Sequence, residues 1–134
     1  MDDDLTVLRD RVPGYSAYSS ERDRHDTDIR VRALLGSALT RARARAGTIA
    51  LDGGDALGDF DAILMRCMFG DQRFVKRFEH ADLSETMIDS FVASDRRLVD
   101  LAGRADGLAS AAQFAPLVRD VEAAFAARDR LLEP

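Results

Sequence analysis

The chain has few of the residues that support secretion or most enzyme chemistry. Cys67 is the single cysteine, and the 134 residues include two histidines, one lysine and no tryptophan. A lone cysteine cannot form an internal disulfide, which favours a reducing compartment. No apolar run approaches the roughly 18 residues that would span a bilayer, and the N-terminus is acidic where a signal peptide would be basic. We therefore predict a cytoplasmic protein without membrane insertion.

Basic character is also scarce in the chain as a whole. The formal net charge is −5, whereas nucleic-acid-binding proteins usually present a net basic face. In the run "RARARAG", Arg41 and Arg45 share a helix face while Arg43 points elsewhere. Cations in a last helical turn also offset the helix dipole. We predict no nucleic-acid binding, although the absence of acidic residues over 29–51 leaves room for a local positive patch that contacts an acidic partner.

What the sequence does contain is a helical pattern from end to end. Apolar residues recur at steps of three and four, and β-branched residues do not alternate with period two. A short acidic N-terminal helix is expected to stop before the turn signal Pro13-Gly14. Ser19 or Ser20 can cap a long helix that continues to Ala46. These features predict an all-α chain.

The second half of the chain contains further helices. Three glycines over residues 53–58 predict a loop, after which Asp59 can cap a helix. Ser84 can cap the next helix, and Pro116 suits the first turn of the last one. Three to four long helices with a short N-terminal helix pack most naturally as an antiparallel up-down bundle. The length fits a single domain over residues 1–134.

One combination of residues has a counterpart elsewhere. Pro13-Gly14-Tyr15 is followed by Tyr18, a charged stretch, "IRVRALL" and, much later, "LSETMIDSFVASDRRLVDLA", which contains Asp95. In this order of features the chain resembles a family of small all-helical bacterial proteins of unassigned function. The resemblance implies a helical bundle, and it brings no catalytic residues because none are assigned in that family.

Motifs for catalysis and for metal or nucleotide binding are incomplete. Gly53 and Gly58 have the separation of a phosphate-binding loop, but Asp59 and Phe60 stand where that loop requires Lys and a hydroxyl residue. The acidic residues nearby lack the register of an EF-hand, and neither histidine stands in a close-spaced ligand motif. The segment "MRCM", residues 65–68, is typical of core packing. We therefore predict no metal and no cofactor, and the sequence leans away from an enzyme.

Two tyrosines precede an unusually polar segment. Tyr15 and Tyr18 are three residues apart, so within one turn both rings can lie on one side and cover the end of the bundle. Residues 19–28 contain no apolar side chain, and their charges alternate in sign. Charges three or four apart on a helix pair for a few tenths of a kcal/mol each, which is typical of a solvated helix start.

Asp95 is a charged residue in an apolar setting, because it lies on the apolar seam of its own helix, the face that carries Phe91, Val92, Leu98 and Val99. A carboxylate buried there without a partner would cost several kcal/mol, so we expect a cation beside it. Arg22 or Arg24 is the partner that the sequence suggests. The prediction is a structural polar cluster of Tyr15, Tyr18, Arg22, Arg24 and Asp95 that locks the bundle. If these residues prove unnecessary for stability, the same segment would instead be a binding site.

Two classes of function follow. The first is a non-enzymatic helical bundle that acts as a protein–protein interaction or self-association module, with a homodimer as the expected assembly. The alternative is a small-ligand-binding or metal-binding helical bundle with a polar site between helices.

Overall fold

The computed structural model describes residues 2–18, 20–46, 54–70, 76–78 and 80–132. All regular structure in this part of the chain is helical, which confirms the all-α prediction. Within it, no helix is both long and apolar enough to cross a membrane. The elements are α1 (Asp2–Arg11), α2 (Glu21–Ala46), α3 (Gly54–Phe69), α5 (Glu85–Asp106), the 3₁₀ turn η1 (Ala111–Gln113) and α6 (Phe114–Arg130).

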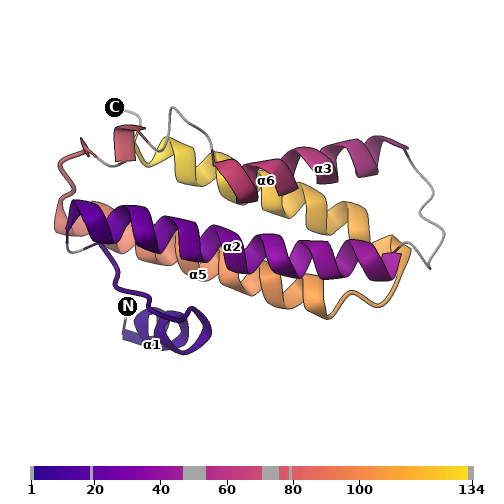
Figure 1. Ribbon diagram of the computed structural model, residues 1–134, viewed down its shortest axis with the longest axis horizontal. Coiled ribbons are helices and arrows are strands. Elements are labelled where there is room, and N and C mark those ends of the chain that lie inside the picture. The colour runs from indigo at the N-terminus through magenta and orange to yellow at the C-terminus, as the bar shows by residue number, and fades with distance from the viewer. Residues whose placement is uncertain (1, 19, 47–53, 71–75, 79, 133–134) are drawn as a thin grey trace.

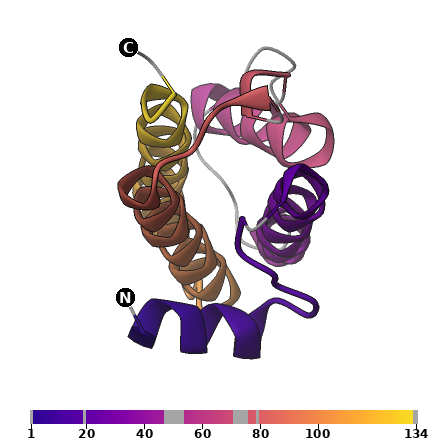
Figure 2. The same cartoon turned by 90° about the vertical axis from the view of Figure 1, so that its left-hand side faces the viewer.

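The long helices lie along a common direction. In Figure 1, α2 and α5 lie beside each other in the lower part of the molecule, and α3 and α6 lie above them. The end-on view in Figure 2 shows α1 at the bottom, lying across the long helices below α5, on which it packs. The core between these helices consists of buried apolar side chains, and the fully buried ones include Leu8, Leu35, Leu39, Phe60, Phe78, Phe91, Leu98, Phe114 and Leu117.

Serine hydroxyls begin two of the long helices, as the sequence predicts. The Ser20 hydroxyl accepts a hydrogen bond from the Asp23 amide at 3.1 Å at the start of α2. The Ser84 hydroxyl accepts one from the Met87 amide at 3.2 Å at the start of α5. Each bond satisfies a backbone donor that has no partner within the helix. Pro116 lies in the first turn of α6, also as predicted.

The predicted loop over residues 53–58 is wrong for the part that the structure describes. Helix α3 begins at Gly54, so Gly58 is inside a helix and Asp59 is not its cap; Gly53 lies outside the described residues. A glycine in a helix costs only about 1 kcal/mol relative to alanine, and burial of the Phe60 and Ile63 side chains in the core favours the helix. Tertiary packing therefore overrides the local glycine signal.

The arginines near the end of α2 face in different directions, as predicted. Arg41 donates to Asp106 of α5 at 3.0 and 3.1 Å, whereas Arg43 pairs with Asp61 of α3. Arg45 donates to the Ala105 carbonyl at 2.5 Å. The run of arginines thus ties α2 to two neighbouring helices.

Candidate functional site

Asp95 is the centre of a buried polar cluster, which comprises Tyr15, Tyr18, Asp28, Arg32, Asp95 and Arg128. Its side chain is fully buried. The Oδ2 atom accepts hydrogen bonds from the Tyr15 hydroxyl at 2.8 Å and from the Tyr18 hydroxyl. The Oδ1 atom accepts one from Nη1 of Arg128 at 2.7 Å. The structure therefore brings together both predicted tyrosines and the predicted aspartate.

The predicted cationic partners of Asp95 are wrong, because Arg128 of α6 takes that place. Arg22 is exposed on the first turn of α2. Arg24 donates from Nη1 to the backbone carbonyls of Ala81, at 2.5 Å, and Phe78, at 3.4 Å. The start of α2 thus directs Arg24 toward the segment before α5, while α6 presents its arginine to the carboxylate from inside the bundle.

Arg128 joins three helices through one guanidinium group. Its Nη1 atom also donates to the Ser94 hydroxyl at 3.1 Å. Its Nη2 atom donates to the Tyr18 hydroxyl at 3.3 Å and to Oδ1 of Asp28 at 3.0 Å. With its side chain only 2% exposed, this arginine is held by a carboxylate from α5 and another from α2.

The cluster continues from α2 to α3. Oδ2 of Asp28 accepts a hydrogen bond from Nε of Arg32 at 2.9 Å, one helical turn along α2. Nη1 of Arg32 then donates to the backbone carbonyl of Cys67 at 3.1 Å. Acids and bases alternate along this path, so each buried charge has an opposite charge beside it, which burial requires.

Aromatic rings shield the cluster from water. Tyr18 packs against Phe78 and Phe91 with ring centroids 5.2 and 5.8 Å apart. The Arg128 guanidinium lies 5.8 Å from the Phe78 ring centre and 5.3 Å from that of Phe91. Such cation–π contacts strengthen when the groups are desolvated. The rings therefore stabilise the arginine that the carboxylates neutralise.

A strained turn positions the two tyrosines. Gly14 has φ of 78° and Ala17 has φ of 53°, which is uncommon for alanine because its Cβ crowds the backbone. The carbonyl of Ala17 accepts a hydrogen bond from the Thr27 hydroxyl at 2.9 Å, and the carbonyl of Pro13 accepts one from Nη1 of Arg30 at 3.0 Å. Helix α2 thus holds this turn over Asp95.

The environment shifts the ionisation of the cluster. Burial, and then the Asp95 carboxylate, raise the pKa of both Tyr15 and Tyr18, so both tyrosines remain protonated donors at neutral pH. Burial raises the pKa of Asp95, while Arg128 and the tyrosine hydroxyls oppose that rise. Burial alone lowers the pKa of Arg128, but the charge of Asp95 and its other neighbours raises it above the usual value. A solute would have to displace the covering turn to reach these groups.

A groove with a different character lies between α2 and α3. The α2–α3 groove has a volume of about 520 Å³ and is lined by Ile29, Arg32, Ala33, Gly36, Ser37, Thr40, Leu64, Cys67 and Met68. Two of these lining residues are large apolar side chains that are exposed, Ile29 by 42% and Met68 by 62%. Met65 and Phe69 of α3 are exposed by 55% and 63% and do not line the groove. Among the residues whose burial is described, these four are the exposed large apolar side chains, and all belong to α2 or α3.

Gly36 fixes the close approach of the two helices that form this groove. A Cβ atom added at Gly36 would lie 3.1 Å from the Cβ atom of Cys67, tighter than ordinary van der Waals contact. Cys67 is itself buried, and burial raises the pKa of its thiol to about 12. The cysteine is therefore a packing residue in the wall of the groove and a poor nucleophile at neutral pH.

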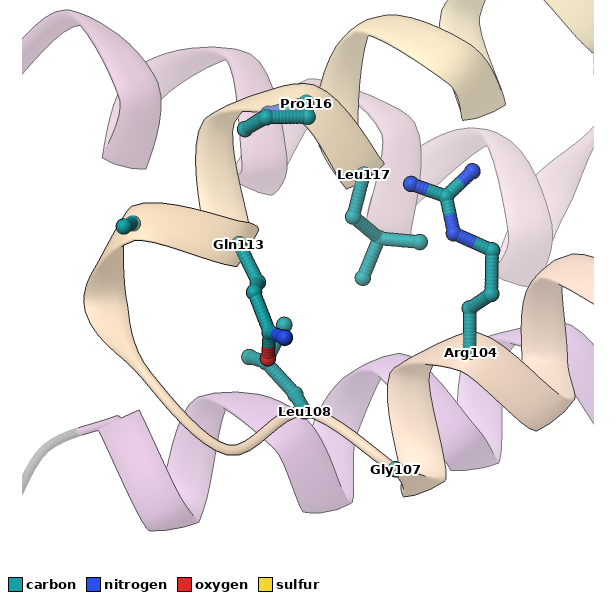
Figure 3. Close-up of a pocket in the computed structure, with 7 residues that line it drawn as sticks. Arg104, Gly107, Leu108, Gln113, Pro116 and Leu117 are labelled. Atoms are coloured by element: carbon teal, nitrogen blue, oxygen red, sulfur yellow. The ribbon is translucent and has the colours of Figure 1, made fainter.

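A second, smaller pocket lies where α5 connects to α6. Its volume is about 350 Å³. Figure 3 shows Arg104 of α5 beside Leu117 of α6, with Gln113 and Leu108 on the opposite side. Nη1 of Arg104 donates to Asp120 at 2.6 Å, and the side-chain carbonyl of Gln113 accepts a hydrogen bond from the Ala109 amide at 2.7 Å. The polar groups beside this pocket are thus engaged with the protein itself.

Comparison with known proteins does not supply a function. No family model, curated protein or solved structure matches the chain. Nor do the described residues include three or more His, Cys, Asp or Glu side chains grouped to hold a metal ion. The buried polar cluster and the α2–α3 groove are the two features of the described residues that bear on function, and the resemblance to a small bacterial family stays a prediction.

Proposed function

We propose that this chain is a non-enzymatic helical module that binds a protein partner or a second copy of itself through the α2–α3 groove. One observation carries the proposal: all four exposed large apolar side chains of the described surface belong to α2 and α3, and two of them, Ile29 and Met68, line this groove. Exposed apolar patches next to a hollow are typical of protein-binding surfaces. The buried polar cluster offers no comparable surface, because its groups bind one another.

We also infer the arrangement that presents this surface, an antiparallel up-down bundle in which successive long helices alternate in direction. Two ion pairs support it. Arg41 and Asp106 join the C-terminal ends of α2 and α5, and Arg66 and Asp129 join the C-terminal parts of α3 and α6. Neighbours in space would then include two parallel pairs, α2 with α5 and α3 with α6. The proposed compartment is the cytoplasm, which the single buried cysteine supports.

The alternative function is a small-ligand site between helices. The pocket in Figure 3 is the place for it, since it lies between α5 and α6 and combines apolar walls with Arg104 and Gln113. It is the weaker proposal because Arg104 already pairs with Asp120. A ligand anion would have to compete with that carboxylate.

Site-specific crosslinking tests the interaction function. A photoreactive phenylalanine analogue is placed at Met68, which lines the groove and is exposed, and, as a matched control, at Ala123, which is exposed on α6. We expect irradiation of living cells of the source organism to give a discrete adduct from position 68 and none from position 123. Adding Ser37→Arg, which places a long charged side chain in the groove, should abolish the adduct. An absence of any adduct from position 68 would contradict the proposed function.

A further inference from the structure

We propose that the α2–α3 groove binds a small aliphatic carboxylate, whose charged end pairs with Arg32 and whose apolar chain lies along α2 toward Thr40. The inference goes beyond the proposed function, because it concerns a small molecule and requires no protein partner. It follows from three features of the groove: an arginine with one nitrogen open to a ligand, largely apolar walls, and the absence of acidic residues among those that line it.

Arg32 is the member of the buried polar cluster that also lines the groove, and only 8% of its surface is exposed. Its Nε atom donates to Asp28, and its Nη1 atom donates to the Cys67 carbonyl. Its Nη2 atom has no hydrogen-bond partner among the described residues, and it is not sealed from solvent. Covering a charged donor without giving it an acceptor is costly. A molecule that fills the groove must therefore bring an acceptor to Nη2.

Most of the remaining wall of the groove is apolar. From Arg32, the α2 side continues past Ala33 and Gly36 to Thr40, about 12 Å along the helix axis, and Leu64 contributes to the α3 side. The Thr40 hydroxyl donates to the Gly36 carbonyl at 2.8 Å, so it is satisfied within its own helix. The volume of about 520 Å³ is within the range of about 300–1,000 Å³ that small-molecule sites have. The groove thus suits a slender apolar chain that extends from the arginine.

The charges beside the groove favour an anion at its Arg32 end. None of the described lining residues is acidic. Asp28, which neutralises Arg32, is only 4% exposed and directs its other oxygen to Arg128, so it does not attract a cationic ligand into the groove. Hydrogen bonds from a guanidinium to a carboxylate are charge-assisted and about twice as strong as neutral ones. A ligand with one carboxylate and no other polar group therefore matches the groove better than an alcohol or an amine of the same length.

Isothermal titration calorimetry of the purified full chain tests this inference, with octanoate as the probe. We expect octanoate to bind with one-to-one stoichiometry. Octan-1-ol and octylammonium have the same chain without the carboxylate, and each should bind more weakly by about tenfold or more. Decanoate should bind more tightly than octanoate and hexanoate more weakly, by about fourfold for each methylene. A failure of octanoate to bind, an alcohol that binds as tightly, or an affinity independent of chain length would overturn the proposal.

Substitution of Arg32 tests the pairing with the carboxylate. Arg32→Gln removes the cation and keeps an amide that can donate to Asp28 or to the Cys67 carbonyl. In this variant we expect octanoate to bind no more tightly than octan-1-ol. Arg104→Gln makes the same change at the arginine of the pocket between α5 and α6 and should leave the octanoate affinity unchanged. A folded Arg32→Gln variant that still prefers octanoate, or a loss of that preference in Arg104→Gln, would overturn the proposal.

A second variant tests the position of the chain, including the case in which Arg32→Gln does not fold. Ser37 lines the groove and is exposed, so Ser37→Leu should fill the hollow without disturbing the core. We expect it to weaken decanoate binding by about tenfold or more. Ala123→Leu makes a similar change at an exposed position of α6 and should leave the binding unchanged. Circular dichroism verifies that both variants are folded, and equal decanoate affinities in the two would overturn the proposal.

The outcomes separate this inference from the proposed function. If octanoate and decanoate do not bind while position 68 forms a crosslink to a protein, the interaction function stands and the inference fails. If the carboxylates bind as expected while position 68 forms no adduct, the inference stands and the interaction function fails. An absence of both binding and crosslinking contradicts both.

Discussion

The buried polar cluster and the α2–α3 groove reverse the usual distribution of residue types. The cluster places two acids, two arginines and two tyrosines inside the bundle, while the groove places isoleucine and methionine side chains at the surface. Inside, every charge has a partner from another helix or another turn. Outside, the described part of the chain leaves the projecting apolar side chains uncovered.

This difference indicates two kinds of role. Buried ion pairs contribute little net stability over well-packed apolar residues, but removal of one partner is costly. We therefore take the cluster as a structural lock that selects one packing of α2, α5 and α6. Apolar side chains that are exposed contribute a favourable free energy only when another surface covers them and removes them from water. The exposed side chains of the groove would therefore favour binding and not folding. Five changes test this contrast.

Asp95→Ala should have the largest effect. It leaves Arg128 buried with one carboxylate fewer, and removal of one member of a buried ion pair costs about 3–5 kcal/mol. Asp100→Ala is the matched control, because Asp100 lies on the same helix with 58% of its side chain exposed. Urea denaturation of both variants measures the difference. Equal midpoints for the two would show that Asp95 does not lock the bundle.

Tyr18→Phe should cost less than the loss of the carboxylate. The change removes one of the two hydroxyls that donate to Asp95 and also an acceptor of Arg128, while the ring packing is kept. A buried group deprived of a hydrogen-bond partner costs about 1–3 kcal/mol. Tyr15→Phe provides the comparison, since it removes the other hydroxyl that donates to Asp95. We expect Tyr18→Phe to lower the free energy of unfolding by more than Tyr15→Phe does.

Alkaline pH should destabilise the protein through the same two tyrosines. Their pKa values are raised from 10.0 in the folded chain, so the stabilisation is complete below pH 10 and is lost as the pH rises above it, where unfolded tyrosines ionise. These are the two tyrosines of the sequence, and tyrosinate absorbance therefore reports on the cluster alone. We expect this absorbance to appear together with unfolding. Titration of both residues near pH 10 in a folded chain would contradict the buried arrangement.

Met68→Asp should barely change folding stability while it weakens binding at the α2–α3 groove. The side chain lines the groove and is 62% exposed, and substitutions at such exposed positions usually stay within about 0.5 kcal/mol. Thermal melting of the purified chain at low concentration measures the stability alone. A large loss of stability here would mean that Met68 belongs to the core, and the contrast between the two regions would fail.

Arg22→Ala should have the smallest effect of all. Arg22 is exposed at the start of α2, so we expect a change within about 0.5 kcal/mol. Arg24→Ala should cost more, because Arg24 donates to two backbone carbonyls. The ratio of the two unfolding midpoints in urea distinguishes them. A larger loss for Arg22 would return it to the role that the sequence suggested.

The helices were largely predictable, because periodic apolar residues and serine caps are local signals. The need of Asp95 for a partner was predictable too, since a carboxylate on an apolar seam has few ways to be satisfied. The identity of that partner was not, because Arg128 lies 33 residues further along the chain. Arg128 also lies on the apolar seam of α6, three residues after Phe125, and Asp28 lies three residues before Val31 on that of α2. If every charged residue on an apolar helix face is expected to need a buried partner, the sequence proposes Asp28, Asp95 and Arg128 together.

The α2–α3 groove could not be read from the sequence. Periodicity places Met65, Met68 and Cys67 on one helix, and it predicts core packing for all of them. Only Cys67 is buried, because Gly36 brings α2 close to that side of α3 and leaves the two methionines outside. Which apolar residues of a helix stay exposed depends on where its neighbours lie, and a single sequence does not record those positions.

The position of Arg128 near the end of the chain affects how the protein folds during synthesis. Its bonds to Tyr18 and Asp28 span 110 and 100 residues, and a ribosome releases the N-terminal partners first. During synthesis Asp28 of α2 and Asp95 of α5 therefore emerge before Arg128 of α6. Closing so long a loop has an entropy cost that must be met before the contacts with Arg128 can form. The last helix would thus complete the fold in one late step. A chain arrested before α6 would be a substrate for chaperones and proteases and would not persist as a shorter stable domain.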